Sequence, residues 1–282
     1  MKIVRTIAEM QGELAKLRLV GKSVGVVPTM GYFHQGHRAL MQRSKATCDI
    51  TVVTLFVNPT QFNDPQDLET YPRDEKSDAT TAEGAGVDYL FAPNAREMYP
   101  DGYATTVVIR GITEPLEGAV RGVGHFDGVT TVVAKLFNIT QPDVAFFGQK
   151  DAQQALVIKK MVRDLDMPIR IEVVPTVREP DGLAMSSRNV RLTPAERPKA
   201  LALRAGLDAA KQAVGAGERR SRAIERAGLE AMKARGVEPE YFAAVPAGTL
   251  LSKEMLEGEV LIAVAARVGD VRLIDNEIVR IG

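Results

Sequence analysis

The stretch Pro28-Thr29-Met30-Gly31-Tyr32-Phe33-His34-Gln35-Gly36-His37 decides how this chain is organised. The run Val24–Val27 before it is typical of a buried parallel strand, and residues 38–46 after it favour a surface helix. Such a strand–loop–helix corner favours negative charge, because N–H groups and the positive end of the helix dipole meet there. His34 and His37 lie on the predicted loop, three residues apart, so both can face one phosphate chain. The sequence therefore predicts a phosphate-binding corner.

The composition is ordinary for a globular enzyme, with 45% hydrophobic and 26% charged residues. Lys plus Arg and Asp plus Glu each number 36, and this balance argues against a general binder of nucleic acid or membrane surfaces. The one cysteine, Cys48, allows no internal disulfide and fits a reducing compartment. The first residues hold no long apolar run, so we expect no signal peptide, no membrane span and a cytoplasmic location.

Strand and helix patterns alternate through the first 175 residues, which predicts βαβ units and a mostly parallel sheet. Further strands are expected at residues 50–57, 87–91, 105–109, 144–147 and 169–174, and helices at 72–85 and 153–165. A glycine-rich loop, residues 118–128, should lead into an apolar helix through residue 137. Alanine-rich helices at 194–214 and 219–235 then precede strands at 240–245, 260–268 and 271–274. We therefore predict an α/β fold, with a Rossmann-like domain over residues 1–176 and a smaller α+β domain over residues 177–282.

Polar side chains follow two of the predicted strands. Asn58 and Gln61 follow residues 50–57, at the strand end where open α/β sheets bind ligands, although amides that only satisfy a turn are an equal alternative. Lys150 follows residues 144–147 and suits a phosphate oxygen. Asp151 is placed to cap the next helix or to contact a ribose or magnesium, and Gln154 lies one turn further on.

Two glycine-containing segments complete the candidate site. Residues 178–189 hold Ser186, Ser187 and Arg188, which can close over bound phosphates, although a polar linker is the alternative. Residues 116–126 include Arg121 and His125, which can meet an anion or lie on a plain surface loop.

A zinc site is the alternative interpretation of the histidines. His34, His37 and His125 are the chain's only three, and three imidazoles can bind zinc with one position open. Against zinc, two of them lie on a helix-start loop, and no carboxylate-rich or cysteine-rich surroundings are apparent.

Five segments in this order resemble the pantothenate synthetase (pantoate–β-alanine ligase) family over nearly the whole chain: residues 28–37, 56–62, 118–126, 148–154 and 185–189. His34-Gln35-Gly36-His37 is also similar to the histidine motif of nucleotidylyltransferases and class I aminoacyl-tRNA synthetases. Met185-Ser186-Ser187-Arg188 resembles the flexible phosphate-binding signature of that wider group. The resemblance implies a nucleotidylyltransferase-type Rossmann-like fold with a C-terminal lid domain.

The resemblance also implies a two-step reaction. ATP and pantoate form pantoyl adenylate and pyrophosphate, and the amine of β-alanine then displaces AMP to form pantothenate. Magnesium would bridge the phosphates, and the protein would be a homodimer. The apolar run at residues 50–57 is a candidate for its interface, which the sequence does not decide. A nucleotidylyltransferase that stops after nucleotide transfer and a non-catalytic nucleotide-binding regulator are the alternatives.

By the resemblance, His37, His34 and Lys150 are catalytic, with His37 at the proton-donor position. Gln61 and Gln154 would bind pantoate, and Gln61 also β-alanine. The implied ATP contacts are Met30, Gly31, Tyr32, Phe33, His34, Gln35, Gly36, His37, Gly148, Gln149, Lys150, Asp151, Val177, Met185, Ser186, Ser187 and Arg188.

The chain departs from the family pattern at three places. Gln149 and Ala152 stand where the family usually has an acidic and an aromatic residue. The usual Arg-Pro-Gly-His-Phe is here Arg121-Gly122-Val123-Gly124-His125-Phe126, one residue longer and without proline. Losing proline removes backbone stiffness, so we expect an active enzyme with an altered affinity or a looser lid.

Overall fold

The computed structural model describes residues 1–63, 65–122 and 124–282, and the chain divides into two compact units. The first unit comprises residues 1–113, 121–148 and 153–175. The second comprises residues 114–120, 149–152 and 176–282. The second unit thus takes two short segments from the part of the chain that the sequence assigned to the first domain. The functional division at residues 176 and 177 stays a prediction.

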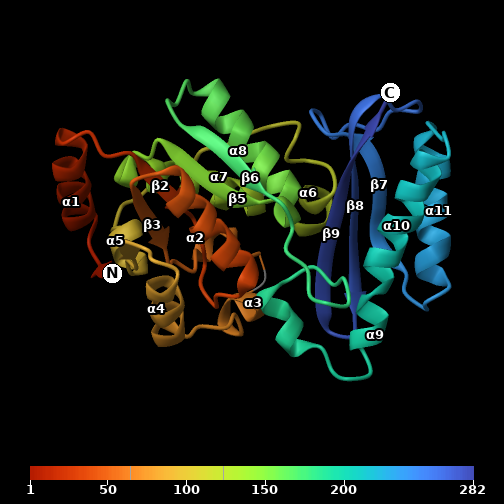
Figure 1. The fold of residues 1–282 in the computed structure, drawn as a ribbon, viewed down its shortest axis with the longest axis horizontal. Helices are drawn as coiled ribbons and strands as arrows, with labels where there is room; N and C mark the ends of the chain where they lie inside the picture. Colours follow the sequence, from red (N-terminus) through yellow and green to blue (C-terminus); the bar gives the residue numbers. More distant parts are fainter. Residues whose placement is uncertain (64, 123) are drawn as a thin grey trace. The chain divides into compact units, whose positions relative to one another are not determined.

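The first unit is built on a six-stranded sheet in which every neighbouring pair of strands is parallel (Figure 1). Its strands, in order across the sheet, are β1 (Lys2–Val4), β4 (Tyr89–Phe91), β3 (Ile50–Thr54), β2 (Val24–Val27), β5 (Val144–Gly148) and β6 (Arg170–Val174). The predicted parallel sheet is therefore confirmed. β3 lies inside the sheet with four of its five residues buried, so the run predicted near a dimer interface belongs mainly to the core.

Helices cover both faces of this sheet because alternate strand residues point to opposite sides. Val26 and Val52 belong to the apolar cluster formed with helices α1 (Ile7–Leu19), α7 (Gly124–Thr140) and α8 (Ala152–Asp164). Val27 and Val53 belong to the cluster formed with α2 (Gln35–Thr47) and α4 (Glu75–Gly84). The shorter helices of this unit are η1 (Pro59–Gln61), α3 (Pro65–Glu69) and α5 (Ala95–Met98).

The strand order places a switch point between β2 and β5, which pair directly through Gly25 with Val144 and Val26 with Ala145. After β2 the chain enters α2 on one face, and after β5 it enters α8 on the other. Open α/β sheets bind ligands outside the carboxyl ends of the strands at such a point. The two segments predicted to bind phosphate follow these two strands.

Two predictions for residues 105–128 were wrong. Residues 105–109 form no strand, because threonine hydroxyls of α7 take the place of a strand partner: the Val107 N–H donates to Thr131 Oγ1 at 2.9 Å, and Thr130 Oγ1 donates to Val107 O at 2.5 Å. The predicted glycine-rich loop holds α6 (Glu117–Arg121) and the start of α7. Val123, in the segment Gly122-Val123-Gly124 that is one residue longer than the family pattern, lies outside the described residues.

The second unit contains a three-stranded antiparallel sheet of β7 (Pro239–Pro246), β8 (Gly258–Val268) and β9 (Val271–Ile281), so the predicted α+β composition is confirmed. Helices α10 (Ala202–Gly215) and α11 (Ser221–Lys233) share one apolar core with it. The predicted helix at 194–214 is divided at Leu201 into α9 (Arg197–Ala200) and α10. The remaining short helices are η2 (Gln149–Asp151) and η3 (Ser187–Arg191).

β9 continues to Ile281, well past the predicted end at residue 274, and so includes the polar triplet Asp275-Asn276-Glu277. Asp275 and Asn276 are each only 4% exposed, because both side chains are hydrogen-bonded inside this unit. Among the described helices, none has an apolar stretch long enough to cross a membrane.

Candidate active site

The loop after β2 has a left-handed backbone at two successive residues, with φ of +91° at Gly31 and +55° at Tyr32. A Cβ atom at Gly31 would lie 2.5 Å from Leu55 Cδ1 and 2.8 Å from Asp78 Oδ2, so only glycine fits. A residue with a side chain, such as Tyr32, adopts this conformation at a cost of about 1–2 kcal/mol. The loop therefore needs a partner that stabilises it.

Asp78 of α4 is that partner. Its carboxylate is 2% exposed and accepts the N–H of Tyr32 at 2.8 Å and that of Phe33 at 2.6 Å. Burial raises the pKa of the Asp78 carboxyl, and the two N–H donors act in the opposite direction. Asp78 was not among the residues predicted from the sequence. The signal that could have found it is its spacing from buried Ala82, which places a carboxylate on the apolar face of the helix.

His34 and His37 are fixed by the start of α2. His34 is its N-cap and accepts the Gly36 N–H on Nδ1 at 3.1 Å, while His37 Nδ1 accepts the His34 N–H at 3.2 Å. A ring nitrogen that accepts carries no proton, so each neutral imidazole has its N–H at Nε2. The ring centroids are 4.2 Å apart. The two histidines thus form one pair, held by the backbone N–H groups that both Nδ1 atoms accept.

Both histidines were predicted on a loop, and for His37 this prediction was wrong. His37 lies inside the helix, in its first turn. The two Nδ1 atoms are engaged by backbone N–H groups, so neither Nδ1 atom can ligate a metal in this arrangement. Within the described residues, no group of three or more His, Cys, Asp or Glu side chains is placed to hold a metal ion.

Gln61 ends the η1 turn and is held by Asn58. The Asn58 side chain donates from Nδ2 to Gln61 Oε1 and to Gly128 O, both at 3.1 Å. Its Oδ1 accepts the hydroxyls of Tyr99 at 2.8 Å and Thr60 at 3.0 Å. Because Asn58 is 1% exposed and bonded on both ends, it positions Gln61, as the alternative of an amide that satisfies a turn predicts; a direct substrate contact of Asn58 stays a prediction.

Two further contacts connect Gln61 to its surroundings. Its Nε2 donates to Met30 Sδ at 3.2 Å. This bond joins η1 to the segment of residues 30–37 after β2, the histidine loop. His125 of α7 donates from Nδ1 to Gln61 O at 2.8 Å. The predicted anion contact of His125 is therefore replaced, at this nitrogen, by a structural bond. Arg121 ends α6, and its carbonyl accepts a hydrogen bond from the amide of Asn63.

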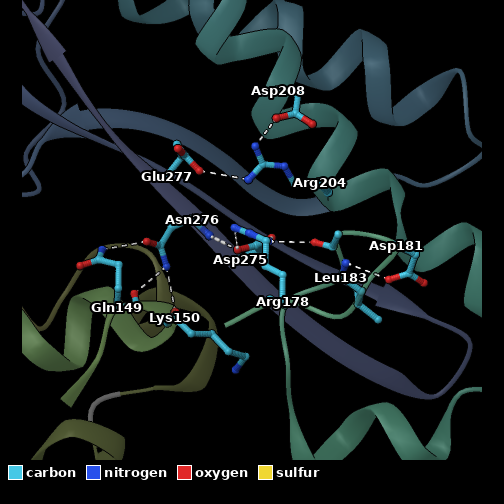
Figure 2. Close-up of polar contacts among 12 residues, drawn as sticks. Gln149, Lys150, Arg178, Asp181, Leu183, Arg204, Asp208, Asp275, Asn276 and Glu277 are labelled. Carbon is cyan, nitrogen blue, oxygen red and sulfur yellow. Dashed lines mark hydrogen bonds and ion pairs between the residues drawn. The ribbon is translucent and has the colours of Figure 1, made fainter. Parts of the chain in front are cut away.

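Lys150 lies in η2, directly after β5. Its side chain is 19% exposed, and its Nζ is 3.9 Å from Asp151 Oδ1. Asn276 of β9 donates from Nδ2 to the carbonyls of Gln149 at 3.0 Å and Lys150 at 2.8 Å, and accepts the Gln149 amide at 2.9 Å (Figure 2). The side chain of Gln149, one of the departures from the family pattern, is thus hydrogen-bonded within the protein. Gln154 is half-buried in the first turn of α8.

Residues 177–188, which include the serines and the arginine predicted to close over phosphates, form a narrow arch. Arg178 pairs with both carboxylate oxygens of Asp275, at 2.6 Å and 3.0 Å (Figure 2). It also forms an antiparallel bridge with Ala184, and the Met185 N–H donates to Val177 O at 3.0 Å. These bonds bring the two arms of the arch together and tie its base to β9.

Ser186 begins the η3 turn as its N-cap, with Oγ accepting the Arg188 N–H at 3.3 Å. Ser187 is buried and Arg188 is half-buried. The first unit thus brings together the histidine loop and Gln61. The second brings together the η2 turn that carries Lys150, the lysine turn, and the arch. The members of the first group are Met30, Gly31, Tyr32, Phe33, His34, Gln35, Gly36, His37 and Gln61, and those of the second are Gln149, Lys150, Asp151, Val177, Met185, Ser186, Ser187 and Arg188.

Known proteins of one enzyme family resemble this chain over nearly its whole length. The sequence model of the pantoate-β-alanine ligase family matches residues 2–278. The chain is 50% identical over 282 residues to the pantothenate synthetase of Moorella thermoacetica, covering all of this chain and 99% of that protein. The chain belongs to the pantoate–β-alanine ligase family. The Acetivibrio thermocellus pantothenate synthetase is 47% identical, with full coverage of both chains.

Solved structures of the ligase family have the same fold. The pantothenate synthetase of Thermus thermophilus matches with a TM-score of 0.93 and 46% identity, covering 98% of this chain and 99% of that one. A pantoate-β-alanine ligase from Francisella tularensis, solved in complex with beta-gamma ATP and β-alanine, matches with a TM-score of 0.81 and 34% identity over 98% of this chain and 97% of that one. The predicted nucleotidylyltransferase-type architecture is confirmed.

Proposed function

We propose that this chain condenses pantoate with β-alanine to form pantothenate, using ATP and passing through pantoyl adenylate with release of pyrophosphate and AMP. The observation that carries the proposal is full-length identity of about half to proteins named pantothenate synthetase. Two segments support it: the histidine pair follows β2 in the chain and the lysine turn (Gln149–Asp151) follows β5, and β2 and β5 are the two strands at the switch point of the sheet. The ligands named for the Francisella tularensis relative support ATP and β-alanine as substrates.

The first step must stabilise charge on the phosphates. When the pantoate carboxylate attacks the α-phosphorus, the bond to pyrophosphate breaks and negative charge builds on the phosphate oxygens. His34 and His37 would donate from Nε2, since the helix cap engages Nδ1 of both rings. Lys150 would supply a fixed positive charge. Ser186, Ser187 and Arg188 would close over the phosphates, and the remaining predicted ATP contacts would bind the nucleotide through their backbone and side chains.

Gln61 and Gln154 are the proposed pantoate contacts, and Gln61 also the β-alanine contact. Asn58 fixes the orientation of the Gln61 amide, so the substrate meets a pre-set hydrogen-bonding group. The amine of β-alanine then attacks the carbonyl carbon of the adenylate, AMP leaves, and the amide bond forms. Magnesium would enter as a complex with ATP, because it is usually bound by phosphates and one or two carboxylates. Asp151, whose side chain is 49% exposed, fits such a role.

The test is a coupled assay of AMP and pyrophosphate, with each substrate left out in turn. We expect AMP formation to require ATP, pantoate and β-alanine together. A nucleotidylyltransferase of another kind would form no AMP that depends on β-alanine. A nucleotide-binding regulator would bind ATP in calorimetry and release no pyrophosphate.

Asp78→Asn is expected to raise the KM for ATP several-fold while the chain still folds. The amide keeps one acceptor but directs an NH₂ group at the other backbone N–H, leaving a buried donor unpaired at a cost of about 1–3 kcal/mol. Steady-state kinetics and thermal unfolding measure the two effects. The matched control is Asp74→Asn, because Asp74 caps the same helix and asparagine caps equally well. A parent-like KM for ATP in Asp78→Asn would refute its role.

Assembly and location stay predictions. The homodimer rests on the family resemblance, and light scattering of the purified protein would measure it. A cytoplasmic location is likewise expected, and fractionation of the source cells would check it.

A further inference from the structure

β9 carries two buried polar residues that the proposed reaction does not use. Asp275 and Asn276 are adjacent, and their side chains leave the strand on opposite sides, as strand geometry requires. In Figure 2, Asn276 extends to the turn at Gln149 and Lys150, and Asp275 extends to Arg178. Burying two such groups is costly unless their hydrogen bonds are satisfied, so their contacts indicate what they do.

Asn276 uses both ends of its amide on the lysine turn. Its Nδ2 donates to the carbonyls on either side of the Lys150 N–Cα–C unit, at 3.0 Å to Gln149 O and 2.8 Å to Lys150 O. Its Oδ1 accepts the Gln149 side chain at 2.9 Å. Fixing two successive carbonyls fixes the peptide planes that flank the Lys150 Cα, and so the direction in which its side chain leaves the backbone. Figure 2 shows that side chain pointing away from Asn276.

Asp275 anchors the strand that carries Asn276. It holds Arg178 through two hydrogen bonds and accepts the backbone N–H of Asn276 on Oδ1 at 2.8 Å. Its side chain is 3% exposed, and Arg178 in turn donates to Gly182 O at 3.1 Å within the arch. The lysine turn and the base of the arch are therefore held by two neighbouring residues of one strand.

We propose that Asn276 is a positioning residue for Lys150, which sets the lysine ammonium relative to the arch of residues 177–188. The inference rests on the proposed function, because it takes Lys150 as a phosphate contact. Asn276 itself touches no substrate and acts through the backbone of the lysine turn.

The experiment measures pyrophosphate release from ATP and pantoate for Asn276→Ala, Asn276→Asp, Lys150→Ala and the double variant Asn276→Ala with Lys150→Ala. The aspartate side chain has the shape of asparagine but no N–H donor, so it faces two carbonyl oxygens without bonding them. We expect each Asn276 variant to lower kcat by about 10- to 100-fold, the effect of small misplacements of catalytic groups. The KM for pantoate should stay near the parent value.

The double variant separates positioning from general stability. If Asn276 acts through Lys150, its removal should cost little more once Lys150 is alanine. If the fold-losses in kcat of the two single variants multiply in the double variant, Asn276 acts independently of Lys150, and the inference is overturned. Normal turnover in Lys150→Ala would refute the phosphate contact itself, and the inference with it. Impaired Lys150→Ala beside normal Asn276 variants would refute the inference alone.

Glu277→Gln is the matched control on the same strand. Glu277 follows Asn276 directly, but its carboxylate pairs with Arg204 and Lys211 of α10 (Figure 2 shows the Arg204 pair). The variant should lose stability without a change in kcat. Thermal unfolding identifies any variant that fails to fold. If Asn276→Ala does, the isosteric Asn276→Asp decides the question, with Asn276→Ser as a third, smaller replacement that retains one hydroxyl donor.

Discussion

His37→Ala is expected to slow pyrophosphate release from ATP and pantoate by about 100- to 1000-fold, the usual loss when one donor to a developing oxyanion is removed. The variant should still fold. It loses the acceptor for the His34 N–H, one bond of a helix cap, which costs about 1 kcal/mol. Stopped-flow or discontinuous assay of pyrophosphate measures the rate, and thermal unfolding measures the stability.

Two further substitutions at His37 separate its cap from its chemistry. Asparagine places an oxygen where Nδ1 lies and no group where Nε2 lies, so His37→Asn should recover stability but not rate. Glutamine places an NH₂ group near the Nε2 position, so His37→Gln should recover part of the rate. Near-parent turnover in both His37→Ala and His37→Asn would show that the imidazole acts only as a helix cap.

Gly128→Ala is expected to have the largest effect on stability and on pantoate binding together. Gly128 lies in α7, where the helix passes against η1: a Cβ atom there would lie 2.6 Å from Thr60 C and 2.7 Å from Gln61 Cα, and would also contact Thr60 O. These are backbone atoms, so the turn itself must move, at a cost of about 3 kcal/mol. Gln61 moves with the turn, so the KM for pantoate should rise. The free-energy equivalent of that rise should be at least as large as the loss in the free energy of unfolding.

Gly124→Ala is the control for the same helix. A Cβ atom at Gly124 would lie 3.6 Å from Asn63 Oδ1, an ordinary contact, and alanine favours helix over glycine by up to about 1 kcal/mol. Its stability should be equal or slightly higher, with an unchanged KM for pantoate. An unaltered KM in Gly128→Ala, measured where the variant is folded, would show that the close approach does not position Gln61.

The sequence by itself determined the class of the fold and the family, and it predicted the segments of the candidate site. Runs such as Val24–Val27 are apolar on both faces, as a parallel strand between two helical layers requires. The histidines, Lys150 and Gln61 follow such runs in the chain, which is why the local pattern predicts them at the carboxyl ends of strands. The family resemblance rests on the same local strings, which is why it covers almost the whole chain.

Only the tertiary structure decided what holds those segments in shape. Asp78 lies 46 residues from Tyr32, and Asn276 lies 126 residues from Lys150, so no local pattern connects either pair. The same is true of residues 105–109, whose β-like sequence pairs with threonine side chains of α7 and forms no strand. Local propensity states what a segment can form, whereas a buried carboxylate or amide must find its partners wherever the chain brings them, and this pairing fixes the geometry of the site.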